Sequence, residues 1–415
     1  MKQKGTGSQG PAGSRSVEQG TKRKQEMKDK YIAKKYWKDV STPLKNVFEK
    51  AAAYEDIINL GVGDPDLTTD PRVTEAAFRD AKAGHTHYTP QRGDVELRRE
   101  LVYFYREEYG YDLPIDNVMI TASGNIGMFY AMQAILDPGD EVIIQSPYYL
   151  PYPNQVRLAG GIPLEFDTLE EEDYQFNVKR LENMINERTK AIVINSPNNP
   201  TGSTLSLETM QKLAQVAEKY DLLVVCDDIY TSFSYQEKFI PFMTLPGMDK
   251  RSIAINSFSK DFLMTGWRVG DIVAPKHIID TIATINEAVT FTPPSVSQRA
   301  AIAALRMRHE IQPPVVEEYK KRMYYASQRV NKLRNMHVPY PPKGTFYLFI
   351  NIKDTGLTSE EVCRRMLEEA HVLMIPGSGF GRCGEGYVRM CCTLPSEELG
   401  RAFDRLGKMS LFKVK

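Results

Sequence analysis

Short apolar runs alternate with segments of helical periodicity between residues 85 and 305. The runs are rich in valine and isoleucine and read VMIT (118–121), EVIIQ (141–145), KAIVIN (190–195), LLVVC (222–226), SIAIN (252–256) and VGDIV (269–273). A strand that is apolar along its whole length has to be covered on both faces, as happens when helices connect parallel strands. The pattern therefore predicts an α/β fold with a mostly parallel sheet in a large domain over residues 85–305.

The C-terminal third of the chain has a different pattern. Residues 346–352 alternate like a strand. Thr358 and Glu361 have the spacing of a capping box, which predicts the start of a helix. Apolar residues at intervals of four and three predict a last helix over residues 399–406. These elements predict a smaller α+β domain.

Charge separates the N-terminal end of the chain from the rest. The 415 residues carry 53 basic and 53 acidic side chains, but residues 1–38 hold 11 basic and 3 acidic ones. Residues 1–23 lack apolar periodicity, which predicts a disordered tail, and residues 24–38 have the pattern of a weakly amphipathic helix. We expect a basic tail with a possible helix (1–37), a small domain (38–84 plus 306–415) and a large domain (85–305).

Composition narrows the class of protein. Hydrophobic residues make up 42% of the chain and charged residues 26%, which excludes collagen and a membrane bundle. Five cysteines without a C-x-x-C pair, and the lack of a long apolar run or secretory signal, predict a cytoplasmic protein that enters no membrane. His85 and His87 have no third ligand in sight, so we predict no metal site.

Polar or reactive residues follow five of the predicted strands, at the edge where open α/β sheets bind ligands. They are Ser123-Gly124-Asn125, Tyr149, Asn199, Asp227 with Tyr230, and Ser257 with Lys260. Each also has a plain structural interpretation. Asp227 and Ser123 could cap helices, and Tyr149 could belong to the core.

As a set, these residues have the chemistry that pyridoxal phosphate needs. Lys260 follows a buried strand, where desolvation lowers the pKa of an amine and leaves it nucleophilic. Asp227 could pair with a protonated ring nitrogen, and Tyr149 could lie under the ring. The N–H groups of residues 123–125, before a helix, and the guanidinium of Arg268 could hold a phosphate.

The same residues lie in segments that resemble the class I/II aminotransferases, the aspartate aminotransferase-like enzymes of fold type I. The segments are SFSK (257–260) with MTGWRVG (264–270), GVGDPD (61–66), YTP (88–90), NPTG (199–202) and the D-x-x-Y of residues 227–230. The similarity spans roughly residues 40–410. It implies a homodimeric, pyridoxal-phosphate-dependent aminotransferase that acts on an L-amino acid and a 2-oxo acid.

The resemblance implies a role for each residue around the cofactor ring. Lys260 would form the internal aldimine and then move a proton between the substrate Cα and C4′ of the cofactor. Asp227 would keep the pyridine nitrogen protonated. Asn199 and Tyr230 would hydrogen-bond the ring hydroxyl, and Tyr149 would stack on the ring.

The resemblance also implies sites for the phosphate and the substrate. The phosphate would lie against Ser123, Gly124, Asn125, Ser257 and Arg268, joined by Tyr88 of the other subunit. Arg389 matches the arginine that grips the substrate α-carboxylate, and Asn199 and Gly63 would line the same place. Closure of the small domain would exclude water during the proton shift.

Residues 286–294 depart from the pattern of one subgroup of the family. A match on Pro293 and Pro294 places Glu287 where that subgroup has an arginine for a dicarboxylic side chain. This disfavours aspartate as a substrate by that route, although other subgroups recognise dicarboxylates differently.

Two other functions stay open from the sequence. The first keeps the cofactor but makes the enzyme a C–S lyase, another elimination enzyme, or one that closes an aminocyclopropane ring. The second is the aminotransferase-like domain of a regulator, for which the basic tail would contact nucleic acid. Such regulators carry a winged-helix domain that the first 38 residues are too short to form, so we expect no nucleic-acid partner.

Overall fold

The computed structural model of the protein describes residues 31–33, 36 and 54–413. The chain separates into two compact units, Met1–Thr42 and Pro43–Lys415, and the elements below all belong to the second. The predicted tail and the predicted helix over residues 24–38 lie almost entirely outside the described residues and stay predictions. The boundaries of the two expected domains also stay predictions.

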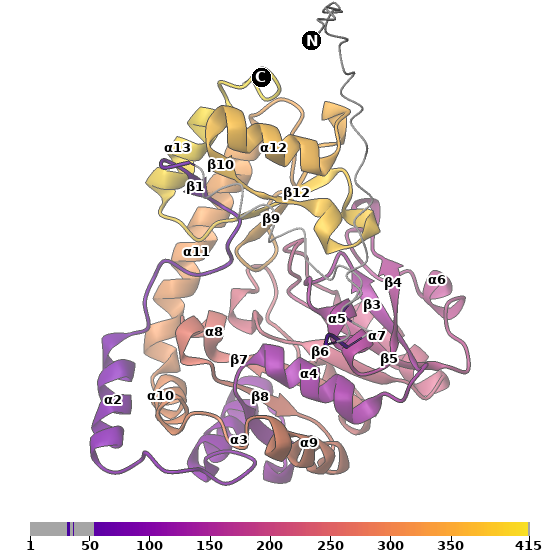
Figure 1. Ribbon diagram of the computed structural model, residues 1–415, viewed down its shortest axis with the longest axis vertical. Coiled ribbons are helices and arrows are strands. Elements are labelled where there is room, and N and C mark those ends of the chain that lie inside the picture. The colour runs from indigo at the N-terminus through magenta and orange to yellow at the C-terminus, as the bar shows by residue number, and fades with distance from the viewer. Residues whose placement is uncertain (1–30, 34–35, 37–53, 414–415) are drawn as a thin grey trace, which may run out of the picture. The chain divides into compact units, whose positions relative to one another are not determined.

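A seven-stranded sheet forms the centre of the second unit, in the order β2-β8-β7-β6-β5-β3-β4 (Figure 1). Its strands are β2 (Val118–Thr121), β3 (Glu141–Ser146), β4 (Ile162–Asp167), β5 (Thr189–Asn195), β6 (Leu223–Asp227), β7 (Ser252–Ser257) and β8 (Gly270–Val273). β8 runs antiparallel to both of its neighbours, and the other pairs are parallel. The predicted α/β fold with a mostly parallel sheet is confirmed.

Helices cover both faces of this sheet, which explains the fully apolar strands. Val142 and Ile144 of β3 belong to a core shared with α4 (Gly124–Ile135), α5 (Tyr152–Leu158) and α9 (Lys276–Val289). Ile143, between them, faces the other way into a core with α6 (Val178–Glu182) and α7 (Leu207–Lys219). Successive side chains of a strand point to opposite faces, so both positions have to be apolar.

Strand β4 is the element of the sheet that the apolar pattern missed. It forms the edge beside β3, its sequence is IPLEFD, and most of its residues are only partly buried. An edge strand tolerates Pro163 because its N–H side need not pair with a neighbour. The strand therefore lacks the apolar run that marks the central strands.

The C-terminal part of the chain, together with the short strand β1, forms two small sheets with helices packed against them. The strands are β1 (Ile58–Asn59) with β10 (Val372–Leu373), and β11 (Ile375–Pro376), β12 (Tyr387–Cys391) and β9 (Tyr347–Asn351) in that order. The predicted N-cap is present, because Thr358 Oγ1 accepts a hydrogen bond from the N–H of Glu361 at 3.2 Å, whereas the carboxylate of Glu361 pairs with Arg364 and Arg365. It begins α12 (Ser359–Ala370), and the predicted last helix is α13 (Ser396–Leu406).

The remaining helices complete the unit. They are α2 (Pro71–Lys82), α3 (Val95–Tyr109), α8 (Phe258–Asp261), α10 (Ser295–Arg306) and α11 (Arg308–Asn331). α11 contacts α10 as well as β9 and α13, so it connects the central sheet region to the small sheets (Figure 1). Within the described ranges, no helix combines the length and the apolar character needed to cross a membrane.

Candidate active site

Loops at the carboxyl ends of β5, β6 and β7 come together at one edge of the central sheet. Asn195 and Asp227 are paired residues at the ends of β5 and β6. The side chain of Asn195 donates from Nδ2 to the backbone oxygen of Asp227 at 2.8 Å, and its Oδ1 accepts from the N–H of Asn199 at 2.7 Å. Asn195 therefore fixes the position of the loop that carries Asn199 relative to Asp227.

Asp227 is a buried carboxylate with one free oxygen. Tyr152 donates from its hydroxyl to Oδ2, while Oδ1 is buried and has no hydrogen-bond partner within the described part of the chain. Burial raises the pKa of Asp227 to about 6, although the hydrogen bond from the Tyr152 hydroxyl acts in the opposite direction. The next helical turn is 3-10 and begins after Tyr230, so the interpretation of Asp227 as a helix cap is wrong.

Lys260 lies one turn beyond β7, on the short helix α8. Its Nζ donates to the backbone oxygen of Gly63 at 2.5 Å, which is a neutral acceptor. Burial lowers the pKa of Lys260 to about 8, and the nearby guanidinium groups of Arg389 and Arg268 lower it further, whereas Asp64 opposes the shift. A considerable fraction of this amine is therefore neutral and nucleophilic near physiological pH.

Arg389 is a buried cation that has no anionic partner among the described residues. Its Nη1 donates to Oδ1 of Asn199 at 3.1 Å and its Nη2 donates to the backbone oxygen of Gly61 at 2.6 Å, while Nε is buried without a partner. The rings of Tyr347 and Phe380 each lie 4.8 Å from the guanidinium carbon. Both oxygens that it contacts are neutral, and among the described residues no ion pair involves Arg389, so its charge is left for a carboxylate of a ligand.

The predicted phosphate-binding residues come from the start of α4 and the turn after β7. Ser123 is the N-cap of α4 and its Oγ accepts from the N–H of Ile126 at 3.3 Å, so the cap interpretation is correct for this residue. A Cβ at Gly124 would lie 3.3 Å from Cβ of Ser257, which brings the two segments into contact. A Cβ at Gly270 would lie 2.8 Å from the backbone nitrogen of Gly124, so the close approach requires a glycine.

The exposed side chains of Asn125 and Arg268 each form a hydrogen bond within the chain. Oδ1 of Asn125 accepts from Nε2 of Gln155 at 3.2 Å. Arg268 has a positive φ of 53° and is exposed, and its Nη1 donates to the backbone oxygen of Thr265 at 2.8 Å. The exposed guanidinium can change partner at little cost, because its present acceptor is a surface carbonyl.

Two of the predicted aromatic residues differ in their surroundings. Tyr149 is partly buried against Tyr152, with ring centroids 5.6 Å apart, and burial followed by the charge of Asp227 raises its pKa. Tyr88 is 83% exposed and contacts Phe291, with ring centroids 5.0 Å apart. A single chain therefore places Tyr149 beside Asp227 but leaves Tyr88 on its surface.

Two tyrosines that the sequence interpretation missed also belong to the site. Tyr152 contacts Asp227, as described above, and the hydroxyl of Tyr347 lies 3.0 Å from that of Tyr230. A Cβ at Gly63 would lie 2.1 Å from the hydroxyl oxygen of Tyr347, so a glycine is required there. Tyr347 lies in the strand predicted over residues 346–352, but a strand pattern does not distinguish a functional tyrosine from a core one.

Three other features of the sequence lie outside this cluster. The glycine-rich residues 377–380 form a short 3-10 helix. Glu287 accepts from Nε2 of Gln91 at 3.0 Å on the surface. Asp228 is buried away from cations, and burial together with the charges of Asp227 and Asp271 raises its pKa well above the usual range.

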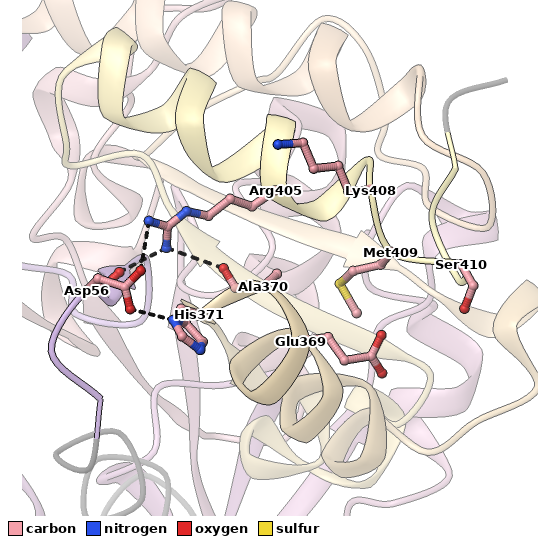
Figure 2. A pocket seen from close by; sticks show the side chains of 8 residues that line it. All are labelled: Asp56, Glu369, Ala370, His371, Arg405, Lys408, Met409 and Ser410. Carbon is pink, nitrogen blue, oxygen red and sulfur yellow. Dashed lines mark hydrogen bonds and ion pairs between the residues drawn. The ribbon is translucent and has the colours of Figure 1, made fainter.

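Residues that line a surface pocket beside α12 and α13 hold the chain segment that leads into the site (Figure 2). The backbone oxygen of Asp56 accepts from Nη1 of Arg405 at 2.9 Å, and its carboxylate pairs with Nη2 at 3.2 Å and with the ring of His371. Ile58 then donates its N–H to the backbone oxygen of His371 at 2.9 Å. These contacts set the path of the chain toward Gly61 and Gly63.

Comparison with known proteins identifies relatives over nearly the whole chain. The family model described as aminotransferase class I and II matches residues 55–406. An aspartate aminotransferase of Pyrococcus horikoshii is 38% identical over 384 residues, covering 91% of this chain and 97% of its own. Aromatic-amino-acid aminotransferase 2 of Thermococcus litoralis is 37% identical over 370 residues, covering 88% and 95%.

A similarity of structure accompanies the similarity of sequence. The solved aspartate aminotransferase of Thermus thermophilus with maleate superposes with a TM-score of 0.81 at 33% identity, covering 88% of this chain and 95% of that one. Sequence and structure thus agree over the region that contains the cluster around Asp227, Lys260 and Arg389.

Proposed function

Because this chain belongs to the aminotransferase class I and II family and is an aminotransferase, we propose that it holds pyridoxal 5′-phosphate beside Lys260. Its substrates are amino acids and 2-oxo acids, as for its relatives. In our proposal it exchanges the amino group between an L-amino acid and a 2-oxo acid at the edge formed by β5, β6 and β7.

The free oxygen of Asp227 is the observation that carries the assignment of the cofactor. Buried carboxylate oxygens are normally hydrogen-bonded, and Oδ1 of Asp227 is buried without a partner while Tyr152 occupies Oδ2. A protonated pyridine nitrogen is a donor of the right charge for this position. When bound, pyridoxal 5′-phosphate supplies an aldehyde that condenses with amines and a ring that withdraws electrons from the substrate Cα.

Each side chain then has a defined task around the cofactor. Asp227 would hold the proton on the ring nitrogen through its charge, and Tyr149 would lie against the ring. Asn199 and Tyr230 would hydrogen-bond the ring hydroxyl. Lys260, whose pKa of about 8 leaves part of it neutral, would supply the amine that holds the cofactor and, once released, would carry a proton between the substrate Cα and C4′ of the cofactor.

We assign the phosphate to the turn between β7 and α8 and to the start of α4. The residues are Ser123, Gly124, Asn125, Ser257 and Arg268. A helix N-terminus favours an anion through its free N–H groups and its dipole, and a guanidinium adds charge-assisted hydrogen bonds.

Arg389 binds the α-carboxylate of the substrate in this proposal. It is buried, its partners are neutral, and its Nε is free, so a carboxylate would satisfy both its charge and its geometry. Asn199 and Gly63 flank this position, since Asn199 accepts from Arg389 and the backbone oxygen of Gly63 accepts from Lys260.

We also propose that the enzyme is a homodimer and that Tyr88 completes the phosphate site of the other subunit. Tyr88 is 83% exposed next to Phe291, which is 46% exposed, and exposed aromatic groups of this kind suit a contact between proteins. Sedimentation of the purified protein would show a dimer. A Tyr88→Phe variant would bind the cofactor more weakly and keep its dimeric mass.

The free cysteines support a cytoplasmic location, which we propose for the protein. Cys383 is partly exposed, and the other cysteines are buried thiols. Free thiols persist in a reducing compartment. Titration of the denatured protein, purified without reductant, would give five reactive thiols per chain.

Replacement of Lys260 tests the proposal. Lys260→Ala should remove the covalent visible chromophore and lower turnover by more than about 10³-fold, because both attack and proton transfer lose their amine. Lys212→Ala is the matched control, because Lys212 is a surface lysine paired with Glu208 on α7. A Lys260→Ala variant that kept the chromophore and full turnover would overturn the proposal.

The names of the relatives suggest which donors to test first. Aspartate and aromatic amino acids are the substrates named for the Pyrococcus horikoshii and Thermococcus litoralis relatives. Incubating the enzyme with each donor alone also tests for elimination, since pyruvate or ammonia released without a 2-oxo acid would indicate a lyase.

A further inference from the structure

We propose that Tyr347 is a positioning residue that directs the hydroxyl of Tyr230 toward the ring hydroxyl of the cofactor. The inference rests on the proposed function, because it concerns the same site. It adds a residue whose hydroxyl acts through Tyr230 and whose ring supports Arg389.

Tyr347 stands at the point where the functional side chains meet. It is the first residue of β9, is 2% exposed, and pairs in register with Cys391 of β12. Its ring lies 4.8 Å from the guanidinium carbon of Arg389 and contacts the ring of Tyr230 edge-on, with centroids 5.7 Å apart at 85°. One side chain thus contacts both the proposed carboxylate-binding arginine and the proposed ring-binding tyrosine.

The hydroxyl of Tyr347 lies between Tyr230 and Gly63. It is 3.0 Å from the hydroxyl of Tyr230, and a Cβ at Gly63 would come within 2.1 Å of it. The backbone oxygen of Gly63 is the acceptor of Lys260. A buried hydroxyl needs a polar partner, and the partner of Tyr347 is the hydroxyl of Tyr230.

Proton counting decides the direction of this hydrogen bond once the cofactor is present. Burial raises the pKa values of both Tyr230 and Tyr347 well above the usual range, so each keeps its single proton. If Tyr230 donated to Tyr347, it could not donate to the ring oxygen. Tyr347 therefore donates to Tyr230, and Tyr230 donates to the ring oxygen, in a relay that strengthens the second bond.

The relay has a spectroscopic consequence. A hydrogen bond to the anionic ring oxygen stabilises the deprotonated form of the bound chromophore and so lowers its apparent pKa. Tyr347→Phe removes only the hydroxyl, and we expect the apparent pKa of the visible band to rise by about 0.5 to 1 pH unit, the size of one hydrogen bond. Tyr230→Phe should raise it further, because the direct donor is lost.

A double-mutant cycle separates the relay from a general effect on packing. If Tyr347 acts through Tyr230, adding Tyr347→Phe to Tyr230→Phe should cause no further shift. Additive shifts, or a Tyr347→Phe variant that titrates like the wild type, would overturn the inference. Tyr220→Phe is the matched control, since the hydroxyl of Tyr220 donates to Glu182 at 3.3 Å and its ring packs against a different core.

The ring of Tyr347 gives a second, independent readout. Tyr347→Phe keeps an aromatic ring beside Arg389 and should leave KM for the amino acid within about twofold of wild type, whereas Tyr347→Ala should raise KM several-fold. A Tyr347→Phe variant with a strongly raised KM would contradict the assignment of the hydroxyl to Tyr230. If the wild type itself formed no pH-dependent visible band with pyridoxal 5′-phosphate, the proposed function would fail, and not only this inference.

Discussion

Two regions of the C-terminal part each bury an arginine, and they differ in what neutralises its charge. Arg322 on α11 is 3% exposed and donates to Asp66 at 2.7 Å and to Glu318 at 2.8 Å. Arg389 on β12 is 5% exposed and donates only to neutral oxygens. Burying a charge without a counter-charge is costly, so the second arrangement indicates a cation kept for a ligand. The first indicates a cation that stabilises the fold.

The largest expected effect is on turnover. Arg389→Ala removes the proposed bidentate contact with the substrate carboxylate, which should lower kcat/KM by about 10²- to 10⁴-fold while thermal stability changes little. Arg401→Ala is the control, because Arg401 is a surface arginine paired with Glu398 on α13. Steady-state kinetics with both variants would test this. Wild-type kinetics of Arg389→Ala would show that Arg389 does not bind the substrate and so does not differ from Arg322 in this way.

Lys260 is a second buried cation that we assign to a ligand, and its pKa predicts how the protein takes up the cofactor. Only the neutral amine attacks an aldehyde, and the pKa of about 8 predicts that covalent uptake by the cofactor-free protein rises about 50-fold from pH 6 to pH 8 and then levels off. Stopped-flow absorbance at a series of pH values would measure this profile. A rate that kept rising tenfold per pH unit to pH 10 would show an ordinary, solvated lysine.

Arg322 should show the opposite behaviour to Arg389. Arg322→Met leaves Asp66 and Glu318 without their cation and should lower the free energy of unfolding by about 3 kcal/mol. Part of the effect is relieved because the side chains of Asp66 and Glu318 are 21% and 40% exposed. Urea unfolding, with kcat measured on the folded fraction, would separate the two roles. Loss of activity without loss of stability would place Arg322 in the site.

The smallest expected effect is on the pH dependence of stability and concerns two buried carboxyl groups. One has an oxygen left for a ligand, and the other is hydrogen-bonded within the fold. Asp227 has a free oxygen, whereas Asp271 accepts from Nδ2 of Asn256 at 2.7 Å, and burial raises its pKa to about 7. A raised pKa means that Asp271 stabilises the fold at low pH and that this contribution is lost as pH rises from about 4 to 7.

An Asp271→Asn variant tests this sign. It should gain about 2 to 3 kcal/mol relative to wild type between pH 5 and pH 8, measured as the difference in the free energy of unfolding. Equal pH dependence of the two proteins would show that Asp271 is ionised in the folded state throughout.

Much of the fold was predictable because the central strands are buried on both faces. Six apolar runs gave strands whose bounds agree with the structure to within one residue, from β2 to β8. The apolar pattern did not predict β4, because an edge strand need not be apolar, as its Pro163 and Glu165 illustrate. The short strand β1 was not predicted either, because its two residues form a strand only by pairing with β10.

The site was predictable where the sheet itself brings residues together. Asn199, Asp227 and Lys260 follow neighbouring parallel strands, whose carboxyl ends meet at one edge. Tyr152 and Tyr347 were not predictable, because their partners Asp227 and Tyr230 are 75 and 117 residues away along the chain. A helix or strand pattern marks such tyrosines as core, and only the folded chain shows where a hydroxyl points.

The half-reaction tests the central claim most directly. The wild-type protein loaded with pyridoxal 5′-phosphate is mixed with one amino acid at a time, aspartate and aromatic amino acids first, and its absorbance spectrum is recorded. We predict that at least one amino acid converts the visible band of the aldehyde form to the near-ultraviolet band of the amine form, and that a 2-oxo acid restores it. A spectrum that no amino acid changes, or conversion accompanied by release of ammonia, would contradict the account.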